Sequence, residues 1–339
     1  MSSITIDQYT PTTDFTTAGS GSATWCFAKD KDGKEVFLKK FLSPVMPDRS
    51  VDLPKKVRDG RIRTCKNFYN QKNAVYEAVR RAANNNIIVP REIFMHGGHY
   101  YVVSDRVHMK DMTIDAVSGL AQENVLRLIR VMAHCLMQLE AQGVVHADLK
   151  PDNFLIKETA GGGYTLKLID FDASYLVSNP PDNCDDVQCD SVYIAPETLQ
   201  FLLEEPVKLT SKVDVFAFAI IIHQMFTGHL PAFDSAYDSV CQAVLKGGKI
   251  GVDSTIPEPY RSLIIRSLEY NPDKRPTLAQ MQKILLSDPI IPVDPVDPVD
   301  SDGLRIFISS SLRTDGKEKA PEAPTPPERG RHMNPLKDL

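Results

Sequence analysis

The sequence lacks several features that would place it in common classes of protein. Its 339 residues contain no apolar run approaching the roughly 20 residues that a membrane-spanning helix needs. Its six cysteines form no Cys-x-x-Cys pair, which argues against a zinc site and for reduced thiols in a cytoplasmic protein. The net charge of −5 gives no reason to expect nucleic acid. The first residues show no basic segment followed by an apolar one, so we expect no signal peptide.

The composition is that of an ordinary globular protein with a tail at each end. Charged residues make up 24% and hydrophobic residues 42% of the chain. Val-Asp-Pro repeats within residues 288–300 favour an extended spacer, so we expect 288–339 to be a Pro-rich, largely disordered tail. Residues 1–14 are expected to be a flexible leader. That leader is either plain disordered chain or an autophosphorylation segment that uses Thr10, Thr12 or Thr13.

One stretch, His146-Ala-Asp-Leu-Lys-Pro-Asp-Asn153, carries most of the chemical information. It supplies an acid at Asp148, a cation at Lys150 and an amide at Asn153. A second acid, Asp170, follows another apolar run after a glycine turn. Phosphoryl transfer to a hydroxyl group needs such a set, because one acid accepts the hydroxyl proton, a cation steadies the phosphate and oxygen atoms bind a metal ion.

This motif, followed by Asp-Phe, resembles the catalytic loop and magnesium motif of eukaryotic-type (Hanks-type) serine/threonine protein kinases. Lys150 favours the serine/threonine type over the tyrosine type. Ala195-Pro196-Glu197 resembles the Ala-Pro-Glu motif, which favours a protein substrate over a small molecule. The resemblance covers about residues 14–288. It implies an α+β, bilobal fold with ATP and Mg²⁺, or Mn²⁺, as cofactors.

The resemblance also implies where the lobes divide. The small, β-rich lobe with one helix would span residues 15–107, and the larger, mainly helical lobe would span residues 108–287. A Gly-x-Gly turn at Gly19 and Gly21, followed by Lys39 on a strand, resembles the phosphate-binding loop and its lysine. Two positions depart from the family: Thr24 replaces the third glycine, and Phe37 replaces a small alanine above the adenine.

Site residues are carried over from the family position by position. The expected catalytic residues are Asp148, Lys150, Lys39 and Glu77, the last being the helix glutamate that would pair with Lys39. The expected ATP-binding residues are Gly19, Ser20, Gly21, Ser22, Cys26, Phe37, Lys39, Asp105, Val107 and Lys150. Asn153 and Asp170 are the expected metal ligands.

Apolar periodicity predicts most of the remaining elements. Amphipathic helices are expected over residues 67–83, 122–142 and 260–269, with a last one running from a Thr277 cap to about 286. Residues 212–228 are apolar nearly all round and predict a core helix. Strand-like runs at 87–95 and 99–104 flank a Gly-Gly turn and lead into the hinge between the lobes.

Two buried contacts are implied by the resemblance in the large lobe. Asp214 would brace the catalytic loop, and Arg275 would pair with Glu197. His146 is expected to be structural. Ala147 stands where the family has an arginine, which suggests activity that does not depend on one activation-loop phosphate.

Three features leave alternatives open. Residues 43–66, with six cations between Lys55 and Lys66, are either a solvated insertion or a basic docking patch for an acidic or phosphorylated partner. Acidic residues between Asp170 and Glu197 are either a solvated loop or a preference for basic substrates. Asp172, in place of a glycine, either stiffens its turn, which we favour, or assists metal binding.

The function that follows is transfer of the ATP γ-phosphate to serine or threonine residues of proteins, with autophosphorylation at sites such as Ser174, Ser178 or Ser191. The main alternative is a nucleotide-binding pseudokinase scaffold. A small-molecule kinase is a third alternative, which Lys150 opposes. Expected partners are protein substrates, and a phosphatase or phosphopeptide-binding protein, without nucleic acid or membrane.

Overall fold

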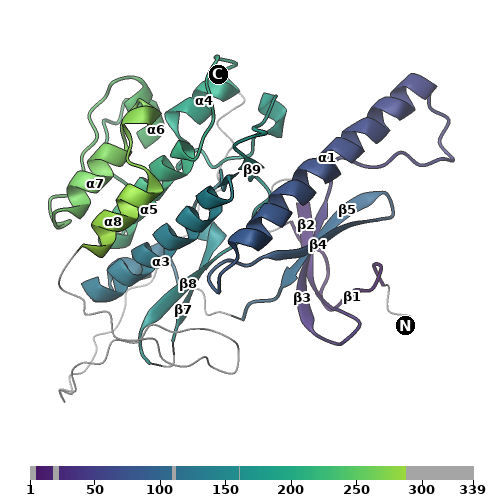
Figure 1. Cartoon of the computed structure of the whole chain (residues 1–339), viewed down its shortest axis with the longest axis horizontal. Helices are drawn as coiled ribbons and strands as arrows, with labels where there is room; N and C mark the ends of the chain where they lie inside the picture. Colours follow the sequence, from purple (N-terminus) through teal and green to yellow (C-terminus); the bar gives the residue numbers. More distant parts are fainter. Residues whose placement is uncertain (1–4, 18–22, 109–111, 160, 288–339) are drawn as a thin grey trace.

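The computed structural model describes residues 5–17, 23–108, 112–159 and 161–287. They form a smaller lobe built around a sheet and a larger lobe built mainly of helices (Figure 1). This arrangement confirms the α+β, bilobal expectation. The predicted tail, 288–339, lies outside the described residues.

The strands are β1 (Thr10–Pro11), β2 (Ala23–Lys29), β3 (Glu35–Phe41), β4 (Pro90–His96), β5 (His99–Asp105), β6 (Val144–Val145), β7 (Phe154–Glu158), β8 (Tyr164–Leu168) and β9 (Tyr175–Leu176). The α-helices are α1 (Lys55–Ala82), α2 (Ile114–Ser118), α3 (Gln122–Ala141), α4 (Pro196–Leu202), α5 (Lys212–Thr227), α6 (Val240–Leu245), α7 (Tyr260–Ser267) and α8 (Leu278–Leu286). Short 3₁₀ turns are η1 (Pro151–Asn153), η2 (Cys184–Asp186) and η3 (Pro272–Lys274).

The small lobe is an antiparallel sheet in the order β1-β2-β3-β5-β4. Its register pairs Trp25 with Lys39 and Phe27 with Phe37. Because directly paired residues share one face of a sheet, these four side chains lie together. The other face is dry, since it buries apolar side chains of β2, β3 and β5 under the N-terminal segment. The register therefore decides which residues of β2 and β3 can meet a ligand.

The N-terminal segment differs from the flexible leader predicted for residues 1–14. Ile6 and Tyr9 are buried, and β1 pairs with β2. The Tyr9 ring stacks on Phe94 with 5.7 Å between centroids, and its hydroxyl donates to Glu92. Residues 5–14 are therefore docked on the sheet, because these two apolar side chains find a surface that the local sequence does not reveal. Residues 1–4 lie outside the described residues.

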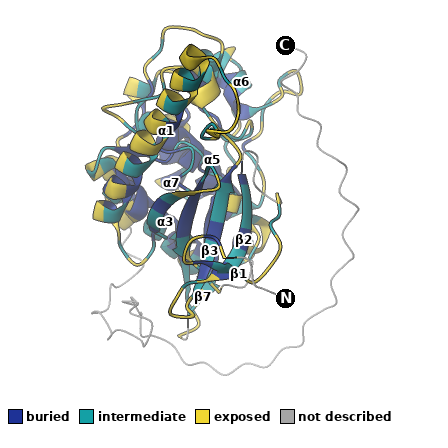
Figure 2. Ribbon diagram, turned by 90° about the vertical axis from the view of Figure 1, so that its right-hand side faces the viewer, coloured by how far each residue is buried: buried dark blue, intermediate teal, exposed yellow. Residues whose placement is uncertain are grey.

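Helix α1 begins at Lys55, twelve positions before the helix predicted over 67–83. Lysine and arginine are good helix formers, so the basic stretch can extend the helix without an apolar stripe of its own. The N-terminal half projects past the sheet (Figure 1) and carries many exposed residues (Figure 2). The second half of the predicted insertion 43–66 is thus a basic, largely exposed helical extension.

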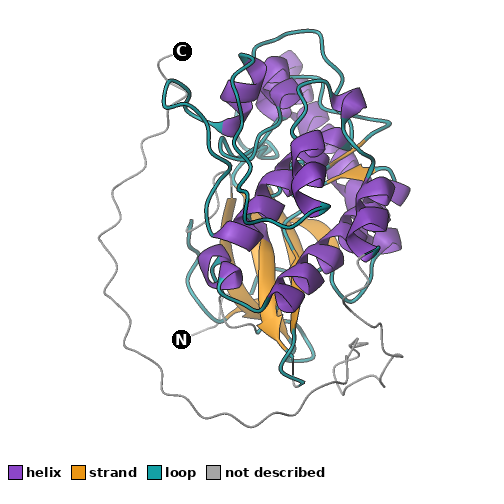
Figure 3. Cartoon of the chain, turned by 90° about the vertical axis from the view of Figure 1, so that its left-hand side faces the viewer, coloured by secondary structure: helices purple, strands orange, loops and turns teal. Residues whose placement is uncertain are grey.

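The large lobe is mainly helical (Figure 3). Its helix α5 contacts α2, α3 and α7. Nearly all of its residues are buried, as its uniformly apolar sequence predicts. Gly228 ends α5 in the left-handed conformation with φ of 77°. At the far end of the lobe, Thr277 and Gln280 form a reciprocal capping box on α8, so the predicted cap is present.

Candidate active site

The β7–β8 hairpin brings the two expected metal ligands together. Asn153 directly precedes β7, and Asp170 follows β8 by two residues. The strands pair Phe154 with Leu168, and the Ile169 N–H donates to the Asn153 carbonyl at 2.9 Å. The register of a short hairpin therefore brings the backbones of Asn153 and Asp170 close together, although 17 positions separate them in the chain.

The catalytic loop holds the Asp148 carboxylate by one oxygen. Its Oδ2 accepts from the Asn153 amide at 2.9 Å and lies 2.8 Å from the Lys150 ammonium. The Asn153 amide also donates to the Asp148 carbonyl at 2.6 Å. Among the described residues, the buried Oδ1 of Asp148 has no hydrogen-bond partner. An unpaired buried carboxylate oxygen is costly, so this atom is suited to accept a hydrogen bond from a bound ligand.

Asp214 braces the loop from α5, as the resemblance implied. Its two carboxylate oxygens accept from the backbone N–H groups of His146 at 2.7 Å and Ala147 at 2.8 Å. Burial raises the pKa of Asp214, and His146 together with the two backbone bonds opposes that rise. Ala147 has a φ of 68°, a strained conformation for a residue with a side chain, so Asp214 stabilises a backbone that would otherwise relax.

His146 has the structural role that the sequence suggested. Its ring is buried, contacts the Ile169 carbonyl through Nε2 at 3.2 Å and lies 5.2 Å from the Phe171 ring. The Ser174 hydroxyl donates to the His146 carbonyl at 3.0 Å. Ser174 is itself buried, which contradicts its selection as a self-phosphorylation site, whereas Ser178 and Ser191 are exposed.

Lys39 of β3 reaches across to the loop that follows β8. Its ammonium lies 2.9 Å from the Asp170 carboxylate and 2.6 Å from that of Asp172. Burial alone would lower the pKa of Lys39, but the charges of Asp172 and Asp170 outweigh it and raise that pKa. Lys39 is therefore a charged group at the junction of the two lobes.

The expected pair between Lys39 and Glu77 is wrong in this structure. Glu77 is exposed, and its carboxylate lies 2.6 Å from the guanidinium of Arg80 on the same helix. The reason is helical phase: α1 buries Val75, Tyr76 and Val79, which turns Glu77 to the solvent side. The residues that α1 directs at the active-site loop are Tyr76 and Lys72, neither of which the sequence pattern singled out.

The face of the sheet that carries Lys39 corrects a second expectation, the ATP contact of Cys26. Cys26 pairs with Leu38 and is fully buried on the far face, so it cannot contact a nucleotide beside Lys39. Trp25 and Phe27, its neighbours in β2, share the face of Lys39 with Phe37. The Trp25 and Phe37 rings lie 5.2 Å apart. The expected phosphate loop, Gly19 to Ser22, lies outside the described residues.

Strand β5 ends at Asp105, and Arg106 and Val107 then lead the chain out of the sheet, where the hinge is expected. The Asp105 carboxylate is exposed and pairs with Lys34 and Arg91, which leaves its backbone for any contact with an adenine. The guanidinium of Arg106 lies 3.7 Å from the centre of the Phe27 ring and 3.3 Å from Glu35. Arg106 therefore covers the aromatic face of the sheet, a cation–π contact that sequence reasoning missed.

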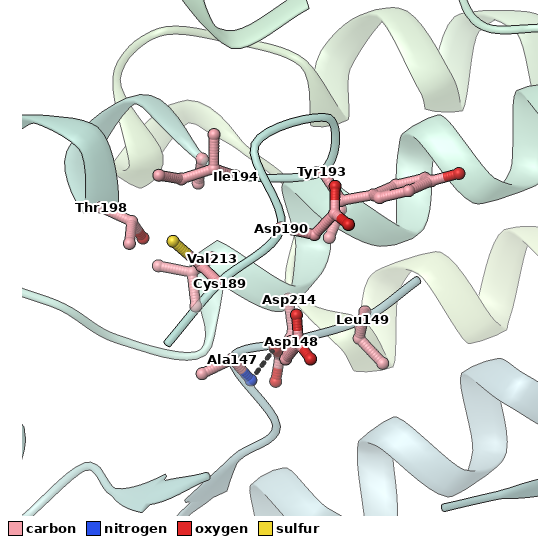
Figure 4. Close-up of a pocket in the computed structure, with 12 residues that line it drawn as sticks. Ala147, Asp148, Leu149, Cys189, Asp190, Tyr193, Ile194, Thr198, Val213 and Asp214 are labelled. Atoms are coloured by element: carbon pink, nitrogen blue, oxygen red, sulfur yellow. Dashed lines mark hydrogen bonds between the residues drawn. The ribbon is translucent and has the colours of Figure 1, made fainter. Parts of the chain in front are cut away.

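A pocket opens between the catalytic loop and the segment leading to α4. Figure 4 shows Asp148 on one side of it and Asp190 and Tyr193 on the other. Cys189 and Thr198 contribute to the same lining. The pocket adjoins Asp148, so a group bound there would lie beside that carboxylate.

The expected metal ion would find two oxygen donors at the start and end of the β7–β8 hairpin, Asn153 and Asp170. The described residues contain no cluster of three or more His, Cys, Asp or Glu side chains that could hold a metal by themselves. Asn153 and Asp170 nevertheless fit Mg²⁺, which prefers oxygen ligands and is commonly bound by one or two protein groups together with substrate phosphates. The Asn153 nitrogen is occupied by Asp148, so its amide oxygen is the atom left for a cation.

A catalytic loop, a cross-lobe lysine and oxygen donors on one hairpin form an arrangement that is typical of nucleotide-dependent phosphotransferases. A family model, the protein kinase domain, matches residues 53–286. The chain therefore belongs to the eukaryotic-type serine/threonine protein kinase family, whose members are ATP-dependent phosphotransferases. The match begins after Lys39, so the placement of that lysine rests on the geometry above.

Curated relatives agree with this assignment. The chain is 29% identical over 220 residues to protein kinase kin1 of Schizosaccharomyces pombe, covering 62% of this chain and 24% of that protein. It is 29% identical over 206 residues to serine/threonine-protein kinase PkaA of Streptomyces coelicolor, covering 60% and 37% respectively. The matched region thus spans about a quarter to two fifths of these relatives' own length. Within the described residues, no helix is both long and apolar enough to cross a membrane.

Proposed function

We propose that this protein transfers the γ-phosphate of ATP to serine and threonine hydroxyls of proteins, including its own. The observation that carries the proposal is the Asp148 carboxylate, with one oxygen fixed by Lys150 and Asn153 and the other unpartnered among the described residues, beside an open pocket. We also propose a cytoplasmic location. Its support is that all six cysteines are free thiols, as is usual in a reducing compartment.

The residues divide the chemistry among them. Asp148 Oδ1 accepts the proton of the acceptor hydroxyl as that oxygen attacks, while Lys150, 2.8 Å from Oδ2, is placed to stabilise charge on the phosphate. Lys39 provides a second cation from the opposite lobe. Magnesium held by Asn153 and Asp170 would neutralise charge on the phosphate oxygens when bound. Asp214 keeps the loop in the conformation that aims Asp148 at the pocket.

The acceptor is proposed to lie within a basic sequence. Asp190 lines the pocket beside Asp148, and Asp185 and Asp186 are exposed on the same segment. Carboxylates beside a peptide path favour lysine and arginine in the peptide by charge complementarity. The effect acts mainly on association, so it should weaken as ionic strength rises.

Phosphate transfer from radiolabelled ATP tests the proposal directly. The full chain is incubated with Mg²⁺ or with a chelator, and with serine and threonine peptides whose flanking residues are basic, neutral or acidic. We expect Mg²⁺-dependent labelling of the protein and stronger labelling of basic peptides. Labelling of small metabolites alone would contradict a protein substrate. Nucleotide binding without any transfer would favour the pseudokinase scaffold instead.

The exposed start of α1 supports a proposed partner. Lys55, Lys56, Arg61, Arg63 and Lys66 are exposed on a helix that projects beyond the sheet. Such a surface suits an acidic or phosphorylated protein, for example a phosphopeptide-binding protein or a phosphatase. We expect a variant with Arg61, Arg63 and Lys66 changed to glutamine to lose a phosphate-dependent partner in pull-downs. Equal recovery by both forms would exclude this surface.

A further inference from the structure

The carboxylate closest to the Lys39 ammonium belongs to Asp172, in the loop that follows β8, and not to helix α1. Asp172 lies two residues after Asp170, and its carboxylate is 2.6 Å from the Lys39 ammonium, closer than Asp170 at 2.9 Å. Both side chains are largely buried, with exposed fractions of 11% for Lys39 and 13% for Asp172. Asp172 is thus a specific partner of Lys39 within the protein, rather than a solvated turn residue.

Helix α1 fixes Asp172 in this position through two side chains one turn apart. The Tyr76 hydroxyl donates to Asp172 Oδ1 at 3.2 Å. The Lys72 ammonium donates to the Asp172 carbonyl oxygen. The backbone N–H of Asp172 also donates to Asp170 Oδ1 at 3.3 Å. The residue therefore has partners for its carboxylate, its carbonyl and its N–H, which leaves it one orientation.

The balance of charge around Lys39 does not require a glutamate from α1. Lys72 brings a cation, not an anion, to the junction with the active-site loop. Burial lowers the pKa of Lys72, while Asp172 and Asp170 oppose that fall and Lys39 adds to it. Two ammonium groups thus face two carboxylates at this junction. A glycine in place of Asp172 would leave the buried Lys72 and Lys39 with Asp170 as their nearest carboxylate.

We propose that Asp172 is the positioning residue that aims Lys39 at the nucleotide phosphates, and that Lys72 and Tyr76 of α1 hold Asp172 in place. The proposal rests on the proposed function, because it assumes that Lys39 binds phosphate. In this proposal Asp172, in the loop that follows β8, takes the place of Glu77 as the carboxylate that pairs with Lys39. A displacement of α1 would then reach Lys39 through Asp172, so the helix and the loop act as one unit.

A charge-relocation cycle tests the assignment. The variants are Asp172→Asn, Asp172→Gly, Lys72→Glu and the double variant Lys72→Glu/Asp172→Gly, with Glu77→Gln as the rival arm. Both Asp172 variants and Lys72→Glu should each lower kcat/KM for ATP by about tenfold to a hundredfold, because Lys39 is misplaced. In the double variant, the glutamate introduced at position 72 of α1 supplies a carboxylate near Lys39 in place of the one that Asp172→Gly removes. We therefore expect the double variant to recover most of the lost kcat/KM.

Nucleotide affinity without turnover separates this proposal from the proposed function. A fluorescent ATP analogue is titrated with magnesium omitted, so the readout depends on Lys39 and not on transfer. We expect Asp172→Asn to weaken binding about tenfold and the double variant to restore it, while Glu77→Gln stays within about twofold of the parent. If no variant, nor the parent, transfers phosphate but the binding cycle holds, the proposed function fails and the positioning role stands.

Two outcomes among Glu77→Gln and the charge-relocation variants would overturn the assignment, and a third comes from the stability control. One is a loss of affinity in Glu77→Gln that matches the loss in Asp172→Asn. The other is a double variant no better than its worse single variant. A thermal unfolding midpoint is measured for each protein, and Asp172→Asn/Lys72→Met serves as the stability control. This pair removes both buried charges, so it should regain stability without regaining nucleotide affinity. Recovery of affinity in that pair would mean that Asp172 only balances Lys72.

Discussion

Asp148→Asn is expected to lower the rate of phosphate transfer by about 10²–10⁴-fold while leaving the fold and nucleotide binding intact. Asparagine has the shape of aspartate, and its side-chain oxygen can still accept from Asn153 and Lys150, so the loop should keep its conformation. What is lost is Oδ1, the one buried carboxylate oxygen that has no hydrogen-bond partner among the described residues. Without it, the acceptor hydroxyl has no base.

The measurement is radiolabel transfer to a serine peptide at saturating ATP, so that the loss appears in kcat. Asp152→Asn is the matched control, since Asp152 is an exposed acid in the same loop and undergoes the same chemical change. It should retain parent activity. Equal activity in Asp148→Asn and the parent would refute Asp148 as the proton acceptor. A parent without activity would favour the pseudokinase scaffold.

The sequence predicted the parts of the site that are set by local spacing. Asp148, Lys150 and Asn153 lie within one loop, and Asp170 is brought to them by a hairpin whose short strands are readable as apolar runs. Few conformations can connect such residues, so residues that are close in the motif also lie close together in the fold. The core helix α5 was equally predictable, because its apolar character does not depend on knowing what covers it.

The failures occurred where the answer depends on tertiary contacts. Glu77 and Tyr76 are adjacent in sequence but about 100° apart around the helix, and packing alone decides which of them faces the active-site loop. The prediction that Cys26 contacts ATP was wrong, because a shift of one position along a strand moves a side chain to the opposite face of the sheet. Tyr9 looked like part of a loose leader because its binding surface, formed partly by Phe94, comes from a distant strand. None of these outcomes has a local signal.

Arg275→Ala should destabilise the large lobe by about 3–5 kcal/mol, although Arg275 is remote from the proposed catalytic groups. Its guanidinium is fully buried and pairs with both carboxylate oxygens of Glu197, at 2.7 and 2.8 Å. It also donates to the backbone carbonyls of Glu269, Lys212 and Tyr270. Removing it leaves a buried carboxylate without its partner and takes one donor from each of three carbonyls, and both losses destabilise the folded state. Denaturant unfolding, followed by the fluorescence of aromatic residues, measures the change.

Comparison with an exposed pair distinguishes burial from charge as the cause. Arg261 pairs with Glu258 at 2.9 Å on the surface of α7, where water screens the interaction, so Arg261→Ala should change stability little. Replacing both buried partners, in Glu197→Leu/Arg275→Met, should be less destabilising than Arg275→Ala, because no charge is then left alone in the core. If Arg275→Ala unfolds at the same denaturant concentration as Arg261→Ala, the pair does not anchor the segment that carries Glu197. That segment lines the pocket beside Asp148, where we propose that the acceptor binds. Loss of the Glu197–Arg275 pair should therefore weaken peptide binding before it affects nucleotide binding.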